Sequence, residues 1–295
     1  MYNYGSQTMP HEGVRLEAEG GRIHEEHWQQ AVQWLDEADS LVIAAGAGMG
    51  VDSGLPDFRG DEGLWRAYPA LREVGLNFVS IASPQSFRDD PELAWGFYGH
   101  RLNLYRHTQP HDGFRILRRW ADKMEHGAFV YTSNVDGQFQ KAGFSEEQIV
   151  ECHGSLHWLQ CMEDCTGRLW KADTWAPSVD ARACRLRSAL PRCVSCGGLA
   201  RPNVLMFDDA EWNAERTRRQ QQRLEAWLHG VTRPVVVELG AGTAVPAVRW
   251  FASLLGAPLI RINLRESRIE SGQGVGLPGR ALEVLNELDR RRARV

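Results

Sequence analysis

Short apolar segments alternate with longer amphipathic segments along most of this chain. Continuous apolar runs are typical of buried parallel strands, and apolar residues spaced three or four apart are typical of helices. Their alternation predicts an α/β fold with a doubly wound parallel sheet. The expected strands are "LVIAAGAG", "AFVYTSN", "PVVVELGAG" and "PLIRINL", and the expected helices include "HEEHWQQAVQWLDEAD", "DPELAWGFYGHRLNLYRH" and "AERTRRQQQRLEAWLHG".

Two connections between these strands are too long for simple crossovers, so each is expected to hold additional structure. We expect a sheet domain over residues 25–156 and 201–295, with a helical insert at about 61–127. Residues 157–200 hold the paired cysteines and are expected to form a small separate module. Residues 1–24 are polar and glycine-bearing, which indicates a flexible tail.

The composition of the chain argues against nucleic acids and membranes as partners. The chain has 295 residues and a net charge of -4, with no basic face evident, so no direct nucleic-acid binding is expected. Its N-terminus lacks an apolar signal-peptide core, and no apolar run reaches the roughly 20 residues of a membrane helix. We expect a cytoplasmic protein without a membrane partner.

A glycine turn follows the first expected strand. Gly46, Gly48 and Gly50 have the spacing G-x-G-x-G, which differs from the dinucleotide fingerprint G-x-G-x-x-G but would still let a pyrophosphate approach the backbone. The alternative is a tight strand-to-helix turn. Pro56 disfavours a helix in the segment that follows, which favours a loop over a ligand.

That loop carries Asp57, Phe58 and Arg59. The two charged side chains can fix a polar ligand, and the phenyl ring can shield a reactive carbon from water. The alternative is a surface turn with a solvated Asp57–Arg59 pair.

Two pairs of cysteines predict a metal site. Cys161 and Cys165 form C-x3-C, and Cys193 and Cys196 form C-x2-C. Four thiolates make a closed tetrahedral site that suits structural zinc and leaves no open position for catalysis. Cys184 lies between the pairs and is an alternative ligand.

Polar residues follow two of the buried runs. Asn134 and Asp136 come at the end of "AFVYTSN", where open α/β sheets bind ligands, although an Asx turn is the alternative. His153 follows "IVEC". A histidine with a pKa of about 6.5 suits a general base, although a lone histidine is more often structural.

Five segments in order resemble motifs of the sirtuin family, of bacterial type, and the resemblance spans about residues 25–290. "GAGMGVDSGLPDFRG" resembles GAGxSxxSGIPDFRG, and "TSNVDGQFQKAG" resembles TQNIDxLxxxAG. "CHGSLHWLQC" resembles the HGS segment with its first metal cysteine, "RPNVLMFDD" resembles RPxVVxFGE, and "INL" resembles the strand end that meets the adenosine ribose.

The resemblance implies a Rossmann-like NAD-binding domain with a zinc module. It implies removal of acyl groups from protein lysines with consumption of NAD, giving nicotinamide, O-acyl-ADP-ribose and free lysine. His153 would be the base that takes a proton from a ribose hydroxyl. The implied cofactor-binding residues are Gly46, Ala47, Gly48, Asp57, Phe58, Arg59, Ser133, Asn134, Asp136, Gly240, Ala241, Gly242, Asn263 and Ala281.

The implied partner is an acylated-lysine protein or peptide. Its backbone would pair by strand addition with the loop at residues 204–208, with Val204, Met206 and Phe207 as contacts. Tyr98 and Arg101 are spaced i and i+3 on an expected helix and could grip a carboxylate. In one sirtuin branch this pair marks a preference for malonyl- and succinyl-lysine. The alternative is a half-buried tyrosine beside a solvent-facing arginine.

The sequence departs from the family motifs at several cofactor positions. Ser133 replaces a glutamine, Gly50 replaces a serine, and "GAG" at 240–242 replaces Gly-Thr-Ser. Hydroxyl donors are lost at two of these places, although backbone amides can still hold a pyrophosphate. These losses favour an alternative function as an NAD hydrolase, an ADP-ribosyltransferase or a binding-only NAD sensor.

Overall fold

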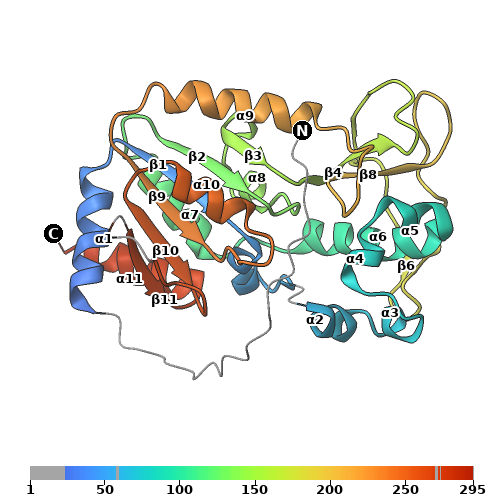
Figure 1. Cartoon of the computed structure of the whole chain (residues 1–295), viewed down its shortest axis with the longest axis horizontal. Coiled ribbons are helices and arrows are strands. Elements are labelled where there is room, and N and C mark those ends of the chain that lie inside the picture. The colour runs from blue at the N-terminus through green and yellow to red at the C-terminus, as the bar shows by residue number, and fades with distance from the viewer. Residues whose placement is uncertain (1–23, 58–59, 270–271, 273, 295) are drawn as a thin grey trace, which may run out of the picture.

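The computed structural model describes residues 24–57, 60–269, 272 and 274–294. At its centre is a six-stranded parallel sheet with the order β11-β10-β9-β1-β2-β3 (Figure 1). The chain adds β2 and β3 on one side of β1, and later β9, β10 and β11 on the other, so the predicted doubly wound sheet is confirmed. These strands are β1 (Ser40–Ala45), β2 (Ala128–Thr132), β3 (Ile149–Glu151), β9 (Pro234–Leu239), β10 (Leu259–Asn263) and β11 (Gly274–Pro278).

The central strand explains why the apolar runs predicted the sheet well. Every residue of β1 is buried, because β1 pairs with β2 and β9 and both of its faces are covered. The edge strand β11 was not expected from the sequence. Its segment, GVGLP, contains two glycines and alternates between buried and half-buried positions, so it gives no continuous apolar signal.

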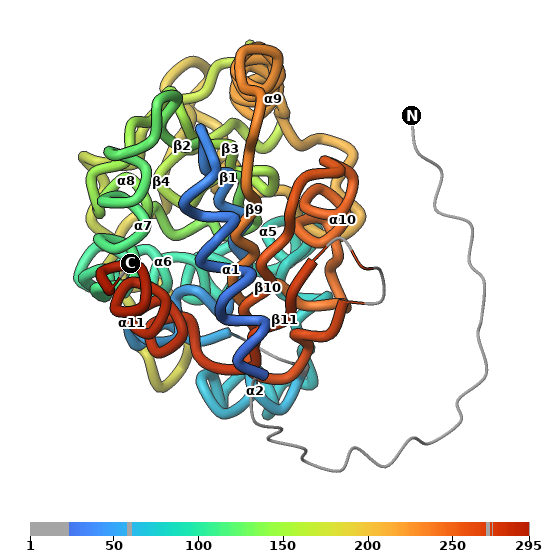
Figure 2. The backbone as a smooth tube through the Cα atoms, turned by 90° about the vertical axis from the view of Figure 1, so that its left-hand side faces the viewer, coloured from blue at the N-terminus to red at the C-terminus, as the bar shows by residue number. Residues whose placement is uncertain are grey.

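Helices cover both faces of the sheet, as Figure 2 shows for α11 and α10 on opposite sides of the strands. One face packs against α1 (Glu25–Glu37), α7 (Asp112–Ala121) and α11 (Ala281–Arg292). The other face packs against α9 (Glu215–Leu228) and α10 (Ala247–Leu254). In the described part of the chain, no helix has both the length and the apolar character needed to cross a membrane.

A second core lies beside the sheet, to the right in Figure 1, and we call this part the small lobe. It combines the helices that follow the glycine turn with the strands around the cysteine pairs. Its helices are α2 (Gly60–Ala67), α3 (Pro69–Glu73), α4 (Phe78–Ile81), α5 (Pro84–Asp89) and α6 (Pro91–His107). Its strands are β4 (Gly154–Cys161), β5 (Trp170–Lys171), β6 (Val179–Asp180), β7 (Arg185–Leu186) and β8 (Ala200–Val204).

The helical insert and the cysteine module therefore share one hydrophobic core. Trp95 of α6 is fully buried, and its indole nitrogen donates to the carbonyl of Ala200 in β8 at 2.9 Å. Gly96 allows close packing, since a Cβ atom there would lie 2.0 Å from the carbonyl oxygen of Cys184. The insert was expected to run over residues 61–127, but α7 packs on the sheet and falls outside it.

Candidate functional site

The carboxyl ends of the parallel strands bring segments from distant parts of the chain to one edge of the sheet. The glycine turn follows β1, Ser133 and Asn134 follow β2, and His153 closely follows β3. Gly240 follows β9, on the other side of β1. The chain reverses its winding direction between β1 and β9, and open α/β sheets bind ligands at such switch points.

The two glycine-bearing turns at this edge pack directly against each other. The amide of Gly48 donates to the carbonyl of Gly240 at 3.0 Å. A Cβ atom at Gly46 would lie 2.7 Å from Cα of Ala241, and one at Gly48 would lie 2.7 Å from Cα of Gly240. Gly240 has a φ of +58°, a left-handed conformation that favours glycine. The glycines are therefore required by backbone packing between the turns, whether or not a ligand is bound.

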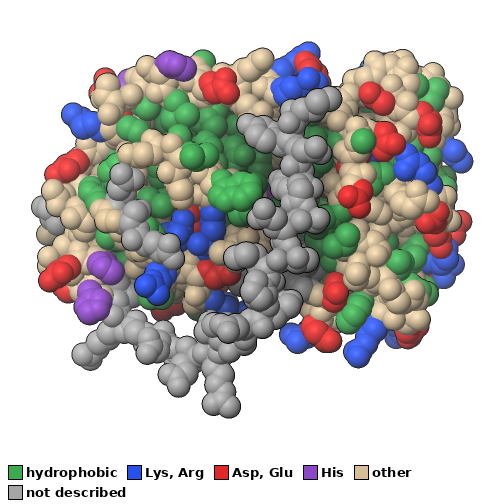
Figure 3. Space-filling view, in the orientation of Figure 1, with side chains coloured by type: hydrophobic (Ala, Val, Ile, Leu, Met, Phe, Trp, Pro, Cys, Tyr) green, Lys and Arg blue, Asp and Glu red, His purple; other side chains and the backbone are tan. Residues whose placement is uncertain are grey.

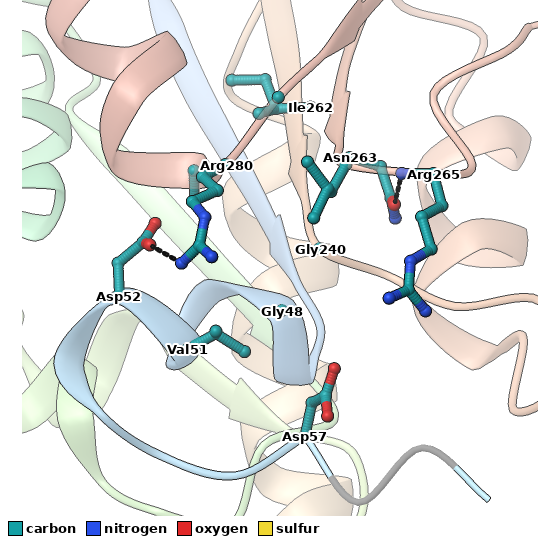
Figure 4. Close-up of a pocket in the computed structure, with 12 residues that line it drawn as sticks. Gly48, Val51, Asp52, Asp57, Gly240, Ile262, Asn263, Arg265 and Arg280 are labelled. Atoms are coloured by element: carbon teal, nitrogen blue, oxygen red, sulfur yellow. Dashed lines mark hydrogen bonds and ion pairs between the residues drawn. The ribbon is translucent and has the colours of Figure 1, made fainter. Parts of the chain in front are cut away.

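A cavity of about 200 Å³ opens beside these turns (Figure 4). It contains several residues that the sequence predicted, together with Arg265 and Arg280, which were not predicted. Arg280 could not be placed from the sequence because β11, which precedes it, gave no signal. The cavity is lined by Gly48, Val51, Asp52, Asp57, Gly240, Ile262, Asn263, Leu264, Arg265, Gly279, Arg280 and Ala281.

Asp52 has a structural role at this cavity. Its carboxylate accepts a hydrogen bond from the amide of Leu282 at 3.0 Å and pairs with Arg280 at 3.4 Å. It therefore satisfies an otherwise free amide in the first turn of α11, from a segment far away in the sequence. Phe58 and Arg59, which were predicted to bind the cofactor, lie outside the described residues.

Asn263 lines the cavity, but its side chain is used within the protein. Its amide nitrogen donates to the carbonyl of Ala241 at 2.8 Å, and its oxygen accepts from the amides of Arg265 and Glu266, both at 3.1 Å. The side chain is only 2% exposed. Asn263 thus fixes the loop after β10 to the turn after β9, and so shapes one wall of the cavity.

Asn134 ties the end of β2 to the glycine turn, since its side-chain nitrogen donates to the carbonyl of Gly46 at 3.0 Å. Asp136 lies apart from the first cavity and lines a second one of about 260 Å³. Burial raises the pKa of Asp136 to about 6, and the nearby carboxylate of Glu151 adds to the increase. One carboxylate oxygen accepts from the amide of Gln138 at 2.9 Å.

His153 lies between the sheet and the small lobe. Burial lowers its pKa below 6.5, and a hydrogen bond with the backbone of Ser133 partly opposes this shift. Its own carbonyl accepts from the amide of Leu205 at 3.0 Å, next to the end of β8. The imidazole is therefore held neutral near pH 7. A neutral imidazole carries a proton on one ring nitrogen only, so the other can accept a proton.

The segment predicted to bind a peptide begins at the end of β8. Val204 and Met206 are 7% and 6% exposed and pack into the small lobe, whereas Leu205 and Phe207 are 39% and 36% exposed. The amide of Phe207 donates to the carbonyl of Ala82 at 2.9 Å. Of the three predicted contacts, only Phe207 exposes much of its side chain.

A buried ion pair holds the same segment in place. Arg201 and Asp209 both have fully buried side chains and form two hydrogen bonds of 2.7 Å. Asp209 also accepts from the amide of Met206 at 3.2 Å. Asp208, which stands where the sirtuin motif has glycine, has a φ of 52°, so the left-handed turn is retained by an aspartate.

Tyr98 and Arg101 both lie on α6 and are buried in the small lobe. Tyr98 is 1% exposed and stacks on Phe87 with a centroid distance of 5.4 Å. Arg101 donates to the hydroxyl of Tyr105 through Nε at 3.0 Å and Nη2 at 2.7 Å, and it lies over the ring of Phe97. Arg101 thus binds the hydroxyl of Tyr105, one turn after it on α6, and both Tyr98 and Arg101 are more buried than the alternative of a half-buried tyrosine beside a solvent-facing arginine.

The four paired cysteines converge at one point, with all their sulfur atoms within 4.8 Å of one another. Cys161 and Cys196 have sulfurs 3.7 Å apart, and those of Cys165 and Cys193 are 3.6 Å apart. Four Zn–S bonds of about 2.3 Å in a tetrahedron require sulfurs about 3.8 Å apart, so the site fits zinc. Cys184 is buried in the small-lobe core and is not part of this cluster.

Comparisons with known proteins agree with this architecture. The sequence profile of the Sir2 family matches residues 46–228. The chain is 33% identical over 264 residues to "NAD-dependent protein deacylase 1" of Pseudomonas aeruginosa, covering 88% of this chain and 97% of the relative. It is 31% identical over 257 residues to the "NAD-dependent protein deacylase" of Pyrococcus furiosus, covering 86% and 93%.

A solved structure of a mutant Sir2 homologue in complex with ADP-ribose is similar in fold. Its TM-score is 0.67 at 25% identity, and the alignment covers 92% of this chain and 97% of that one. The profile match covers more than half of this chain, and the alignments to both relatives cover most of it. The chain belongs to the Sir2 family.

Proposed function

We propose that this protein is an NAD-dependent protein-lysine deacylase, which releases nicotinamide, O-acyl-ADP-ribose and free lysine. The observation that carries the proposal is the position of His153, a neutral imidazole between the switch point of the sheet and the exposed segment after β8. Family membership supports it, because the relatives from Pseudomonas aeruginosa and Pyrococcus furiosus are named NAD-dependent protein deacylases.

The residues around the first cavity suit a dinucleotide. The packed turns after β1 and β9 place their backbone groups at the switch point. The cavity extends from Gly48 to Ala281, which is the first residue of α11. Bound NAD would supply a ribose carbon that is open to attack and nicotinamide as the leaving group. His153, at the end of β3, would take a proton from a ribose hydroxyl through its free ring nitrogen.

The acylated peptide would lie along the exposed side of the segment after β8. Leu205 and Phe207 present their side chains there, and the Arg201–Asp209 pair holds the segment rigid. The amides of Leu205 and Phe207 are already bonded to His153 and Ala82. A peptide that adds as a strand would therefore donate its own amides to carbonyls of this segment. Zinc held by the four cysteines would have a structural role.

Release of nicotinamide from NAD, with and without an acylated lysine peptide, tests this function. Release that depends on the peptide and yields O-acyl-ADP-ribose is the expected result. Release without peptide would instead support an NAD hydrolase, and binding of NAD without any release would support a sensor. The sensor and hydrolase are kept as rivals because Gly240, Ala241 and Gly242 bring no hydroxyl to the turn. The next hydroxyl in the sequence is that of Thr243, and it already donates to the carboxylate of Glu266 at 2.9 Å.

We further propose that Arg101 favours acyl groups that end in a carboxylate. Its guanidinium is buried, and it is bonded to the neutral hydroxyl of Tyr105, so an incoming carboxylate would gain a charge-assisted partner. Arg101→Met should lower kcat/KM for succinyl- or malonyl-peptide by about 10- to 150-fold and spare acetyl-peptide.

The matched control is Tyr105→Phe, which removes the hydroxyl but keeps the guanidinium, and which should retain the preference for acidic acyl groups. The measurement is a side-by-side comparison of acetyl-, malonyl- and succinyl-peptides on the wild type and both variants. A wild type that prefers acetyl-peptide, or an Arg101→Met variant that loses all three substrates equally, would leave Arg101 with a structural role only.

A further inference from the structure

We propose that the first cavity binds a phosphate on the 2′ oxygen of the adenosine ribose, and that Arg265 is the residue that binds it. The ligand class is a 2′-phosphorylated adenine dinucleotide, such as NADP, or its ADP-ribose 2′-phosphate fragment. The inference rests on the proposed function, in which the adenosine half of a dinucleotide occupies this cavity.

The order of the strands places the adenosine ribose near Arg265. In open α/β sheets the pyrophosphate lies at the glycine turn after the first strand, which here is the turn after β1. In the sheet, β9 lies next to β1 on the side away from His153, and β10 lies next to β9. Neighbouring strands are about 4.8 Å apart, so the end of β10 lies about 10 Å from that of β1. A ribose that continues from the pyrophosphate along the cavity therefore reaches the loop after β10.

Of the described residues that line the cavity, none at the end of β10 carries a carboxylate. Dinucleotide sites that select NAD use a carboxylate to bind the 2′ hydroxyl of the adenosine ribose, and the same charge repels a 2′-phosphate. Among the described residues of this loop, the acid is Glu266, and its carboxylate is bonded within the protein at the turn after β9. It accepts from the amide of Thr243 at 3.2 Å and from its hydroxyl at 2.9 Å, and it pairs with Arg249 at 3.4 Å.

The acids that do line the cavity come from the segment after the glycine turn. They are Asp52 and Asp57, and Figure 4 shows both on the side of the cavity away from Asn263. Asp52 is bonded to the amide of Leu282 and paired with Arg280. Neither acid belongs to the loop after β10, and Asp52 is occupied by partners from the start of α11.

Arg265 supplies a guanidinium where the carboxylate is missing. Its backbone amide is fixed by Asn263 at 3.1 Å, and Figure 4 shows its side chain running from the end of β10 toward the level of Gly240. Within the ranges that the structure describes, its guanidinium forms no hydrogen bond or ion pair. Arg280, across the cavity, is partly neutralised by Asp52. Arg265 is therefore the cation available to a phosphate at this end.

The test is isothermal titration calorimetry with ADP-ribose and ADP-ribose 2′-phosphate as probes. Wild-type protein should bind the 2′-phosphorylated probe at least as tightly as ADP-ribose. Arg265→Met should weaken binding of the 2′-phosphorylated probe by about 10-fold while changing ADP-ribose affinity by less than about 3-fold. Arg265→Glu should reject the 2′-phosphorylated probe more strongly, since it places a carboxylate at this position. The matched control is Arg294→Met, which removes the same charge from an exposed residue near the C-terminus.

Each outcome decides between the two proposals. If wild type binds ADP-ribose but rejects the 2′-phosphorylated probe by 10-fold or more, this inference is wrong and the proposed function stands. The same holds if Arg265→Met weakens both probes equally, because Arg265 would then contact the pyrophosphate or support the loop. If neither probe binds the wild type, the proposal of an NAD-consuming enzyme fails, and this inference fails with it.

Discussion

At the scale of single residues, the environment of His153 determines what its side chain can do. Burial lowers the pKa of the imidazole below 6.5, so the ring is neutral near pH 7. The nearby backbone of Ser133 favours the charged ring and opposes this shift only in part. A neutral histidine is ready to accept a proton from a bound ligand. That state is what a general base at the end of β3 requires.

His153→Ala should therefore abolish most acyl-peptide turnover without preventing nucleotide binding. Loss of a general base typically costs about 10²- to 10⁴-fold in rate. The measurement is kcat with acyl-peptide, together with calorimetric titration of ADP-ribose to show that the fold and the cavity are retained. His107→Ala, on the exposed end of α6, is the matched control. Turnover within a few-fold of wild type would rule out the role of base.

At the scale of elements, the site depends on two turns that pack backbone against backbone. The turn after β1 and the turn after β9 are separated by almost two hundred residues, yet Gly48 and Gly240 leave no room for a side chain between them. Both glycines line the cavity beside the switch point. The zinc site is a second example, because it joins the loop after β4 to the one before β8.

Gly240→Ala should destabilise the protein by more than the cost of its backbone conformation alone. A left-handed alanine costs about 1 kcal/mol, and its Cβ atom would also lie 2.4 Å from Cα of Gly48. Gly256→Ala is the matched control, because Gly256 has a φ of +65° with nothing within 4 Å of a built Cβ atom. Urea unfolding of both variants should show the larger loss of stability at Gly240. Equal losses would contradict the role of turn-to-turn packing.

Cys193→Ser should lower both the zinc content and the stability of the folded protein. The reason is that the binding energy of zinc at a closed site contributes directly to the free energy of folding. We expect one zinc per chain in the wild type, less in the variant, and a melting temperature lower by at least about 5 °C. Cys184→Ala is the control, and it should keep its zinc because Cys184 lies in the small-lobe core. A metal-free wild type, or a variant with an unchanged melting temperature, would contradict a structural zinc site.

At the scale of the whole molecule, the two cores meet where the sheet ends. The large core packs helices on both faces of the sheet, and the small-lobe core joins α2–α6 to the strands around the cysteines. His153 and the segment after β8 lie at the junction of the two. Four histidines in these parts of the molecule are partly or fully buried, and burial lowers the pKa of each one; they are His100, His111, His153 and His157.

These histidines should make the folded state sensitive to mild acid. Their folded pKa values lie below the unfolded value of about 6.5, so the unfolded chain binds more protons near pH 6. The stability they contribute is present above pH 6.5 and is lost as the pH falls through their folded pKa values. Asp136 acts in the opposite direction, because its pKa is raised to about 6 and its contribution is lost as pH rises through that value.

Urea unfolding between pH 5 and pH 8 measures this dependence. The free energy of unfolding should fall as the pH is lowered from 7.5 to 5.5, and Asp136→Asn should make the fall steeper by removing the opposing group. A free energy of unfolding that rises over the same interval as the pH falls would contradict the lowered pKa values of these four histidines.

The sequence by itself determined the features that depend on local pattern. The apolar run before Gly46 predicted β1, and helical spacing predicted α1, α6 and α9 to within two residues at each end. The cysteine spacing predicted the cluster, although the two pairs have different spacings, C-x3-C and C-x2-C. These predictions succeeded because periodicity and spacing act over a few residues, and because buried strands and zinc ligands tolerate few residue types.

The tertiary structure alone decided the features that depend on contacts between distant segments. It placed Arg265 and Arg280 in one cavity with Gly48, bonded Asp52 to the first turn of α11, and put the helical insert and the cysteine module in one core. It also showed that the glycines are required by packing between two turns. No local pattern encodes such contacts, since they arise only when the whole chain has folded and brought the ends of the strands together.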